Sequence, residues 1–100
     1  MLQVMGNIRI RRPNALGKAM ARQKTESMAL SMEAKLGIRW QWRGDQLNFD
    51  TPRGAACGTS GTVLVDDNSV HVEIALPLLL RGYRGAVEDK VHDELDRLLR

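Results

Sequence analysis

The feature that most constrains the fold is a pair of alternating runs on either side of a Gly-Asp dipeptide. Before the dipeptide, Ile38, Trp40 and Trp42 alternate with arginine and glutamine. After it, Leu47 and Phe49 alternate with polar residues. An alternation of period two places apolar side chains on one face of a strand and polar side chains on the other. Two such runs around a glycine-containing turn predict a β-hairpin with one buried face.

Three further segments carry strand signals. Residues 7–12 alternate isoleucine with arginine. Residues 55–65 predict a strand whose two glycines indicate a bulge or a close backbone approach. A polar turn at residues 66–68 then leads into the alternating run 70–76. The last two segments together predict a second hairpin.

Two segments predict helices. Residues 15–36 contain no proline and are rich in helix-forming residues, with Asn14 as a candidate N-cap and Gly37 as a C-terminal stop. After Pro77, which suits the first turn of a helix, apolar residues recur at spacings of three and four. This single apolar stripe consists of Leu80, Tyr83, Val87, Val91, Leu95 and Leu98. Two glycines near its start predict that the helix frays or begins late.

The predicted order of elements is strand, helix, hairpin, hairpin, helix. Antiparallel strands joined by short turns, with both helices on one face, define an α+β two-layer sandwich with a sheet of about four to five strands. A length of 100 residues suits one domain. Residues 1–100 are therefore expected to form a single α+β domain, with residues 1–6 as a flexible N-terminal segment.

The helix predicted over residues 15–36 is apolar on two sides. With about 100° between successive residues, one side carries Leu16, Met20 and Leu30. The nearly opposite side carries the candidate oligomer contact, which consists of Ala21, Met28, Met32 and Leu36. Only one side can face the sheet of the same chain, so the second side is expected either to form a homodimer contact or to be a scatter of surface methionines.

The strands of the first half place arginines on one face of the sheet. Arg9 and Arg11 alternate with isoleucines, and Arg39 and Arg43 alternate with tryptophans. These four side chains form a candidate anion-binding face that suits phosphate groups. The tryptophans alternate to the opposite face, so stacking of nucleic-acid bases is not supported. Nucleic acid is therefore not the favoured partner.

The charge of the chain is unevenly divided. The net charge is +3, but residues 1–54 hold ten Lys and Arg against four acidic residues, and residues 55–100 hold five against eight. The basic half is suited to an anionic partner. The alternative, which we favour, is that the two halves neutralise each other within the fold or between subunits.

The sequence shows no catalytic, cofactor or metal constellation. His71 and His92 have no cysteine or second histidine at ligand spacing, which gives a zinc site little support. Cys57 is expected to be an inert packing residue. The glycine-rich segment 54–61 lacks the Gly-Lys-Ser/Thr ending of a phosphate loop and does not open a helix. We therefore expect a protein that is not an enzyme.

The chain is expected to be cytoplasmic. Its longest apolar stretch, residues 74–80, contains a proline and is far shorter than the roughly 20 residues that cross a bilayer. Its first residues lack the pattern of a secretory signal. A single cysteine fits a reducing compartment.

Several short motifs resemble one family. They are Ile8-x-Ile10 with Arg12-Pro13-x-x-Leu16-Gly17, Trp42-x-Gly44-Asp45-x-Leu47-x-Phe49, Gly58-x-x-Gly61, Leu76-Pro77-x-Leu79-Leu80 and Leu95-x-x-Leu98. Through these motifs the chain, from about residue 8 to its end, resembles the polyhydroxyalkanoic acid system proteins. The resemblance implies a short bacterial protein whose gene lies near polyester granule genes, which is a context rather than a reaction. Many members have a histidine where this chain has Asn14, so no catalytic or ligand role is expected there.

The leading hypothesis is a non-enzymatic accessory or interaction protein, associated with polyhydroxyalkanoate granules or their metabolism, that acts as a homo-oligomer through surface contacts. It rests on the doubly apolar first helix and on the lack of a convergent polar site. The first alternative is an anion- or nucleic-acid-binding module that uses the arginine face. The second is a small apolar-ligand or acyl-chain binding protein, which requires an internal apolar cavity.

Overall fold

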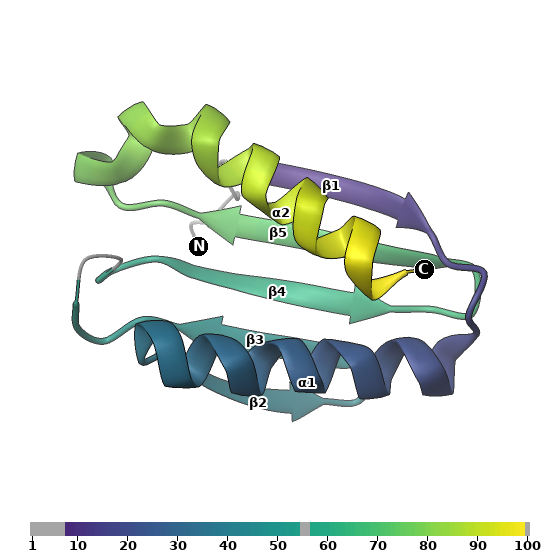
Figure 1. Cartoon of the computed structure of the whole chain (residues 1–100). Coiled ribbons are helices and arrows are strands. Elements are labelled where there is room, and N and C mark those ends of the chain that lie inside the picture. Colours follow the sequence, from purple (N-terminus) through teal and green to yellow (C-terminus); the bar gives the residue numbers. More distant parts are fainter. Residues whose placement is uncertain (1–7, 55–56, 100) are drawn as a thin grey trace, which may run out of the picture.

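The computed structural model describes residues 8–54 and 57–99 and has an α+β fold (Figure 1). Its elements in chain order are β1 (Ile8–Pro13), α1 (Lys18–Leu36), β2 (Arg39–Arg43), β3 (Gln46–Asp50), β4 (Ser60–Val65), β5 (Ser69–Ala75), the 3-10 helix η1 (Leu78–Tyr83) and α2 (Arg84–Leu98). The predicted fold class and order of elements are confirmed, with η1 as an addition before α2. The predicted flexible segment 1–6 lies outside the described residues.

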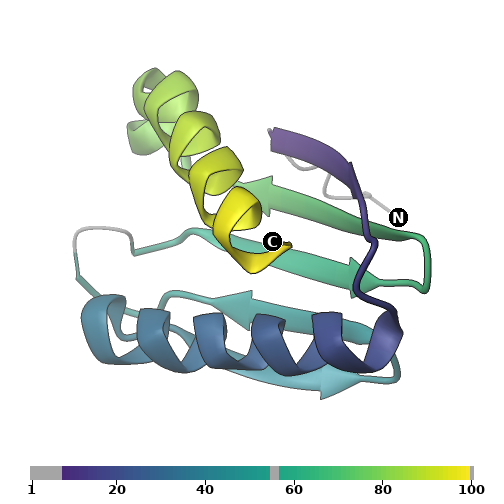
Figure 2. The same cartoon turned by 45° about the vertical axis from the view of Figure 1, so that its right-hand side comes forward.

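One five-stranded antiparallel sheet forms the first layer, in the order β1-β5-β4-β3-β2. Both helices cover the same face of it, α1 on the side of β2 and β3 and α2 on the side of β1 and β5 (Figure 1 and Figure 2). β1 pairs with β5, from Ile8 opposite Ile74 to Pro13 opposite Ser69. Consequently β1 and β2, which are separated along the chain by α1, form the two opposite edges of the sheet.

A tight turn sets the register of the β2–β3 hairpin. Gly44 has a φ of 59° and Asp45 has a negative φ. This combination is typical of a type II′ turn, whose twist matches that of the flanking strands. The turn makes Arg43 and Gln46 the closing pair of the hairpin. With this register, the apolar residues of both strands share the face that the helices cover.

The core lies between the sheet and the two helices. Its buried apolar side chains are Ile8, Ile10, Ala21, Ala29, Leu47, Val63, Val65, Val70, Val72, Ile74, Leu76 and Leu95. Trp40 and Trp42 of β2 pack against this cluster and stay partly exposed. Arg12 donates to the Asp96 carboxylate, and its Nη1 lies 3.4 Å from Nδ1 of His92. These polar contacts tie β1 to α2 at the border of the core.

α1 packs on the sheet through a stripe of small residues. Ala21 and Thr25 are fully buried, and Ala29 is nearly so. The Thr25 hydroxyl donates to the Ala21 carbonyl at 2.7 Å, so its polar atom is satisfied inside the core. Small side chains let the helix approach the sheet closely, and the sheet then supplies most of the apolar volume at the contact.

Ala21 is therefore not available for the predicted oligomer contact on α1. Ala21 lies in the core of its own chain, and Met28 and Met32 are half-buried on the same side. Leu36, at the end of the helix, is largely exposed. The side that was expected to face the sheet is instead the outer one, where Leu30 is 53% exposed. Whether the protein forms an oligomer stays a prediction.

The start of α1 also differs from the prediction. The helix begins at Lys18 after Gly17, whose φ is 85°. The Lys18 N–H donates to Asp67 Oδ1 of the β4–β5 turn at 3.3 Å, so a side chain distant in the sequence satisfies this helix terminus. Asn14 is buried in the preceding loop, where it accepts from the Leu16 N–H at 2.9 Å and donates to the Asp66 carbonyl at 3.0 Å. Asn14 therefore joins this loop to the β4–β5 turn rather than capping the helix.

The C-terminal helical segment is divided, in agreement with the predicted late start. η1 precedes the α-helix, which begins at Arg84. Leu95 and Leu98 of the predicted stripe are buried, but Tyr83 is 62% exposed. A 3-10 helix has about three residues per turn, so residues of η1 do not continue a stripe that has α-helical spacing.

β4 begins at Ser60, later than predicted, and residues 55–56 lie outside the described residues. Gly61 keeps regular register opposite Phe49 of β3, so there is no bulge at this residue. A Cβ atom at Gly61 would lie 2.5 Å from the Glu73 carbonyl oxygen and 2.8 Å from the Phe49 ring. The close backbone approach predicted for this segment is confirmed at Gly61.

Candidate functional site

The face of the sheet opposite the helices, which we call the open face, carries its side chains in rows. Residues that are opposite each other on neighbouring antiparallel strands lie side by side. One row consists of Arg11, His71, Leu64, Gln46 and Arg43, and the next of Arg9, Glu73, Thr62, Asn48 and Gln41. Both rows begin with an arginine at the β1 edge, and between β1 and β2 their only ionisable side chains are Glu73 and His71.

The four predicted arginines lie on the open face but not together. Arg9 and Arg11 belong to β1, whereas Arg39 and Arg43 belong to β2 at the other edge. Four strand spacings of about 4.8 Å separate the two pairs by about 19 Å. The four arginines of the predicted anion-binding face therefore do not form one continuous patch, because β5, β4 and β3 lie between the two strands that carry them. Whether they bind an anion stays a prediction.

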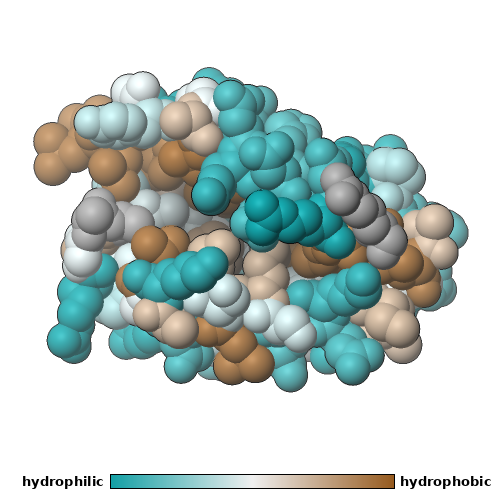
Figure 3. All heavy atoms as spheres, in the orientation of Figure 1, coloured by the Kyte–Doolittle hydropathy of each residue, from teal (hydrophilic) through white to brown (hydrophobic). Residues whose placement is uncertain are grey.

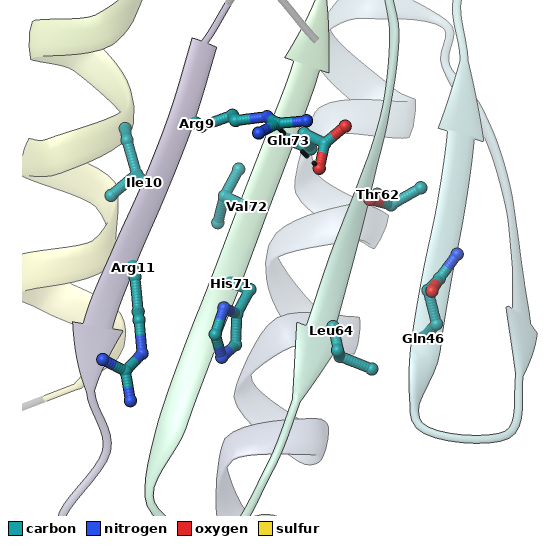
Figure 4. Close-up of a pocket in the computed structure, with 9 residues that line it drawn as sticks. All are labelled: Arg9, Ile10, Arg11, Gln46, Thr62, Leu64, His71, Val72 and Glu73. Atoms are coloured by element: carbon teal, nitrogen blue, oxygen red, sulfur yellow. Dashed lines mark ion pairs between the residues drawn. The ribbon is translucent and has the colours of Figure 1, made fainter. Parts of the chain in front are cut away.

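From the β1 edge across β5 and β4 to Gln46 of β3, the open face has a shallow hollow of about 420 Å³ (Figure 4). Its lining includes Arg9, Arg11, His71 and Glu73. Arg9 Nε lies 3.8 Å from Glu73 Oε2. The side chain of Arg11 makes no hydrogen bond or ion pair with another described residue. This edge therefore combines one paired guanidinium group with one that is available to a ligand.

At the β2 edge, Arg39 forms a forked pair with Asp50, with distances of 3.3 Å and 2.7 Å from Nε and Nη2 to the two carboxylate oxygens. The hydrogen bond from Arg39 lowers the pKa of the Asp50 carboxyl, and the bond to Asp50 raises the pKa of Arg39. The side chain of Arg43 makes no hydrogen bond or ion pair with another described residue. Both edges thus present one paired and one available arginine.

A separate cluster fixes the β2–β3 turn to the start of α1. Lys18 Nζ lies 3.0 Å from Asp45 Oδ2, and Arg22 Nη1 lies 2.9 Å from Asp45 Oδ1. Arg22 also donates to the Gly44 carbonyl at 2.6 Å, and its guanidinium carbon Cζ lies 4.1 Å from the centre of the Trp42 ring. The hydrogen bond from Lys18, followed by that from Arg22, holds the pKa of the Asp45 carboxyl below its usual value.

We expect Asp45→Asn to destabilise the protein near neutral pH and to flatten its response to acid. The folded-state pKa of Asp45 is lowered, so its contribution to stability is present above the unfolded-state pKa of about 4 and is lost as the pH falls through the folded-state value. Urea denaturation at about pH 7 and about pH 3 measures this, and the gap between variant and wild type should shrink in acid. Asp89→Asn, on exposed α2, is the control. A gap of equal size at both pH values would contradict the assignment.

Ser69, His71 and Asp66 meet near the β4–β5 turn, a group that sequence reasoning missed. Ser69 Oγ lies 2.9 Å from His71 Nε2, and Asp66 Oδ2 lies 3.7 Å from the same nitrogen. In a serine hydrolase the serine and the aspartate contact opposite ring nitrogens. Both contact Nε2 here, so the group lacks the geometry of a hydrolytic triad. Its only signal in the sequence is the spacing of two residues that puts Ser69 and His71 on one strand face.

Exposed apolar side chains gather on η1 and form what we call the apolar ridge. It consists of Leu78, Leu79 and Tyr83, which are 78%, 91% and 62% exposed. Figure 3 shows the hydrophobic surface at the upper left, where Figure 1 places the η1 end of the helical segment. Tyr83 was expected in a buried stripe, and no pattern in the sequence marked the two leucines as a surface.

The described residues show neither a metal cluster nor a membrane span. Within them, no group of three or more His, Cys, Asp or Glu is placed to hold a metal ion. None of the helices in the described ranges is long and apolar enough to cross a bilayer. Cys57, which was expected to pack in the interior, is exposed, and its Sγ lies 3.4 Å from the Pro52 carbonyl.

The fold and these surfaces define a small two-layer α+β protein with one open polar sheet face and an apolar ridge on its C-terminal helical segment. A family model described as polyhydroxyalkanoic acid system protein matches residues 8–99. The chain belongs to this family, which confirms the resemblance that its motifs show. Neither the curated proteins nor the solved structures contain a match to the chain.

Proposed function

We propose that the protein is a non-enzymatic accessory protein of the polyhydroxyalkanoate system that attaches to polyester granules in the cytoplasm through the apolar ridge. The observation that carries this proposal is the exposure of Leu78, Leu79 and Tyr83 on one short helix. The family description supplies the context. An aliphatic polyester presents methylene groups, and covering them with apolar side chains removes both surfaces from water.

The position of the ridge suits attachment to a surface. The ridge lies on η1, whereas the buried residues of the C-terminal helical segment, Leu95 and Leu98, lie at the far end of α2. Contact with a granule therefore does not require the core to open. Arg81 and Arg84 are exposed beside the ridge and can keep their charged groups in water while their stems lie along an apolar surface.

We expect Leu78→Gln/Leu79→Gln to bind polyester particles about 30-fold more weakly than the wild type. Full burial of one leucine contributes about 1.5–3 kcal/mol, so a surface that covers roughly half of each side chain accounts for about 2 kcal/mol in total. Cosedimentation of purified protein with washed poly(3-hydroxybutyrate) particles measures the bound fraction at several protein concentrations.

Leu30→Gln is the matched control, because Leu30 is an exposed leucine on α1, away from the ridge. It should bind as the wild type does, and circular dichroism should show that every variant is folded. If the double variant bound as well as the wild type, attachment through the ridge would be refuted. If the wild type itself stayed in the supernatant, granule attachment would be refuted.

A further inference from the structure

The outer edge of β2 exposes backbone groups whose identity follows from the register. The two-residue turn makes Arg43 and Gln46 a hydrogen-bonded pair. Hydrogen-bonded and non-bonded pairs alternate along an antiparallel ladder, so every second residue of β2, counted back from Arg43, bonds to β3. The N–H and C=O groups of Trp40 and Trp42 therefore point away from β3, toward the outside of the sheet.

The backbone hydrogen bonds between the β3 and β4 segments support this alternation. The Val65 N–H donates to the Asp45 carbonyl at 2.9 Å, and the Thr51 N–H donates to the Thr59 carbonyl at 2.9 Å. Both bonds follow the same register as the β3–β4 ladder. The odd-numbered residues of β3 therefore form their backbone hydrogen bonds with β4. The even-numbered residues of β3 form theirs with β2.

No described part of the chain covers this edge. β2 is the last strand of the sheet, and Figure 1 shows no labelled element beyond it. No described residue bonds to the outward backbone groups of Trp40 and Trp42. β2 contains no proline and keeps regular pairing along its length, so it lacks two common devices that stop edge strands from pairing. The edge offers two donors and two acceptors to an incoming strand.

The side chains next to this edge on the covered face are held in place. The Trp40 indole N–H donates to Glu33 Oε1 at 2.8 Å, and the Trp42 indole N–H donates to Glu26 Oε1 at 2.9 Å. Both carboxylates belong to α1, which therefore fixes the two half-buried rings. An incoming strand would meet two ordered apolar surfaces on this face and two arginines on the open face.

A second copy of this chain fits the edge poorly. Two β2 strands that pair around a two-fold axis, with Trp40 opposite Trp42 of the second copy, would use all the outward groups. That register sets Arg39 of each copy opposite Arg43 of the other. Like charges directly opposite each other destabilise a sheet. The charge at this edge therefore favours a partner strand with negative side chains.

We propose that the outer edge of β2 binds an extended acidic segment of another protein as an additional strand. The backbone of the segment pairs with Trp40 and Trp42, and its apolar side chains rest on the two indoles. Its carboxylates lie opposite Arg39 and Arg43. Asp50 already provides the same chemistry from within the sheet, because β3 places it opposite Arg39. The recognised pattern is acidic, apolar, polar, apolar, acidic.

The test uses two peptides, one built around Glu-Val-Gln-Val-Glu and one around Lys-Val-Gln-Val-Lys, titrated into the ¹⁵N-labelled full chain up to about 1 mM. The glutamate peptide is expected to shift the amide signals of Trp40 and Trp42 and to slow their hydrogen exchange, since paired N–H groups are protected. The lysine peptide is expected to bind at least about tenfold more weakly, because it sets like charges opposite each other.

Arg43→Glu should weaken binding of the glutamate peptide about tenfold and strengthen binding of the lysine peptide. Arg11→Glu is the matched control, because it makes the same change of charge on the same face but at the β1 edge. It should leave both affinities unchanged. If the two substitutions had equal effects, the peptide would be attracted by the overall charge of the protein and not by the β2 edge, and the proposal would be overturned. Shifts confined to β1, or no shifts at about 1 mM, would also overturn it. These outcomes do not depend on the apolar ridge.

Discussion

Ala21→Lys is expected to leave the protein largely unfolded at room temperature, whereas Leu30→Lys should leave it folded. Ala21 is fully buried against the sheet, and Leu30 is 53% exposed on the other side of the same helix. An uncompensated buried charge costs about 3–5 kcal/mol, and the added volume costs about 1–3 kcal/mol more. Domains of ordinary stability have about 5–15 kcal/mol in total, so the first substitution removes most of it.

Far-UV circular dichroism and urea titration of both variants measure this difference. Leu30→Lys should change the free energy of unfolding by less than about 0.5 kcal/mol, as is usual for exposed positions. If the two substitutions were tolerated equally, or if Leu30→Lys were the damaging one, the assignment of the packed side of α1 would be wrong.

Gly61→Ala is expected to destabilise the protein by about 3 kcal/mol, although alanine suits a strand no worse than glycine does. The new Cβ would lie 2.5 Å from the backbone carbonyl oxygen of Glu73 and 2.8 Å from the Phe49 ring. The ring can turn aside, but the carbonyl belongs to the neighbouring strand β5 and can move only if the ladder moves with it.

Gly85→Ala is the matched control for this substitution. Gly85 lies in α2, and a Cβ atom added there would meet nothing within 4 Å, so alanine should stabilise the helix by up to about 1 kcal/mol. Thermal or urea denaturation of both variants gives the comparison. A Gly61→Ala protein as stable as the wild type would show that β4 and β5 do not pack this closely.

The sequence was sufficient where the determining interactions are local. The β2–β3 hairpin follows from an alternation of period two and from a glycine that can adopt the positive φ of the turn. The late start of α2 likewise follows from glycines near its beginning. In each case the residues that decide the structure are only a few positions apart.

The order of the strands could not be predicted from such signals. Period-two alternation assigns each arginine to a face but gives no neighbour to its strand. Arg9 and Arg43 therefore looked like members of one patch until the pairing of β1 with β5 placed them at opposite edges. The candidate site changed from one basic surface to two edges because this pairing joins distant parts of the chain.

The packed side of α1 was missed for a different reason. Large apolar residues lie on both sides of the helix, so hydrophobicity alone does not choose between them. The structure uses Ala21 and Thr25, whose small size lets the helix lie close to the sheet. The choice depends on the shape of the opposing surface, which a single sequence does not show.

The pairing of β1 with β5 also orders events while the chain is being made. A ribosome releases the N-terminus first, so β1 leaves it well before the strand beside which it finally lies. The β2–β3 and β4–β5 hairpins close over short turns, whereas joining β1 to β5 closes a loop that contains α1 and three other strands. Until residues 69–75 are available, β1 lacks the strand with which it pairs, and its backbone N–H and C=O groups stay unpaired. The sheet can be completed only after β5 has been made.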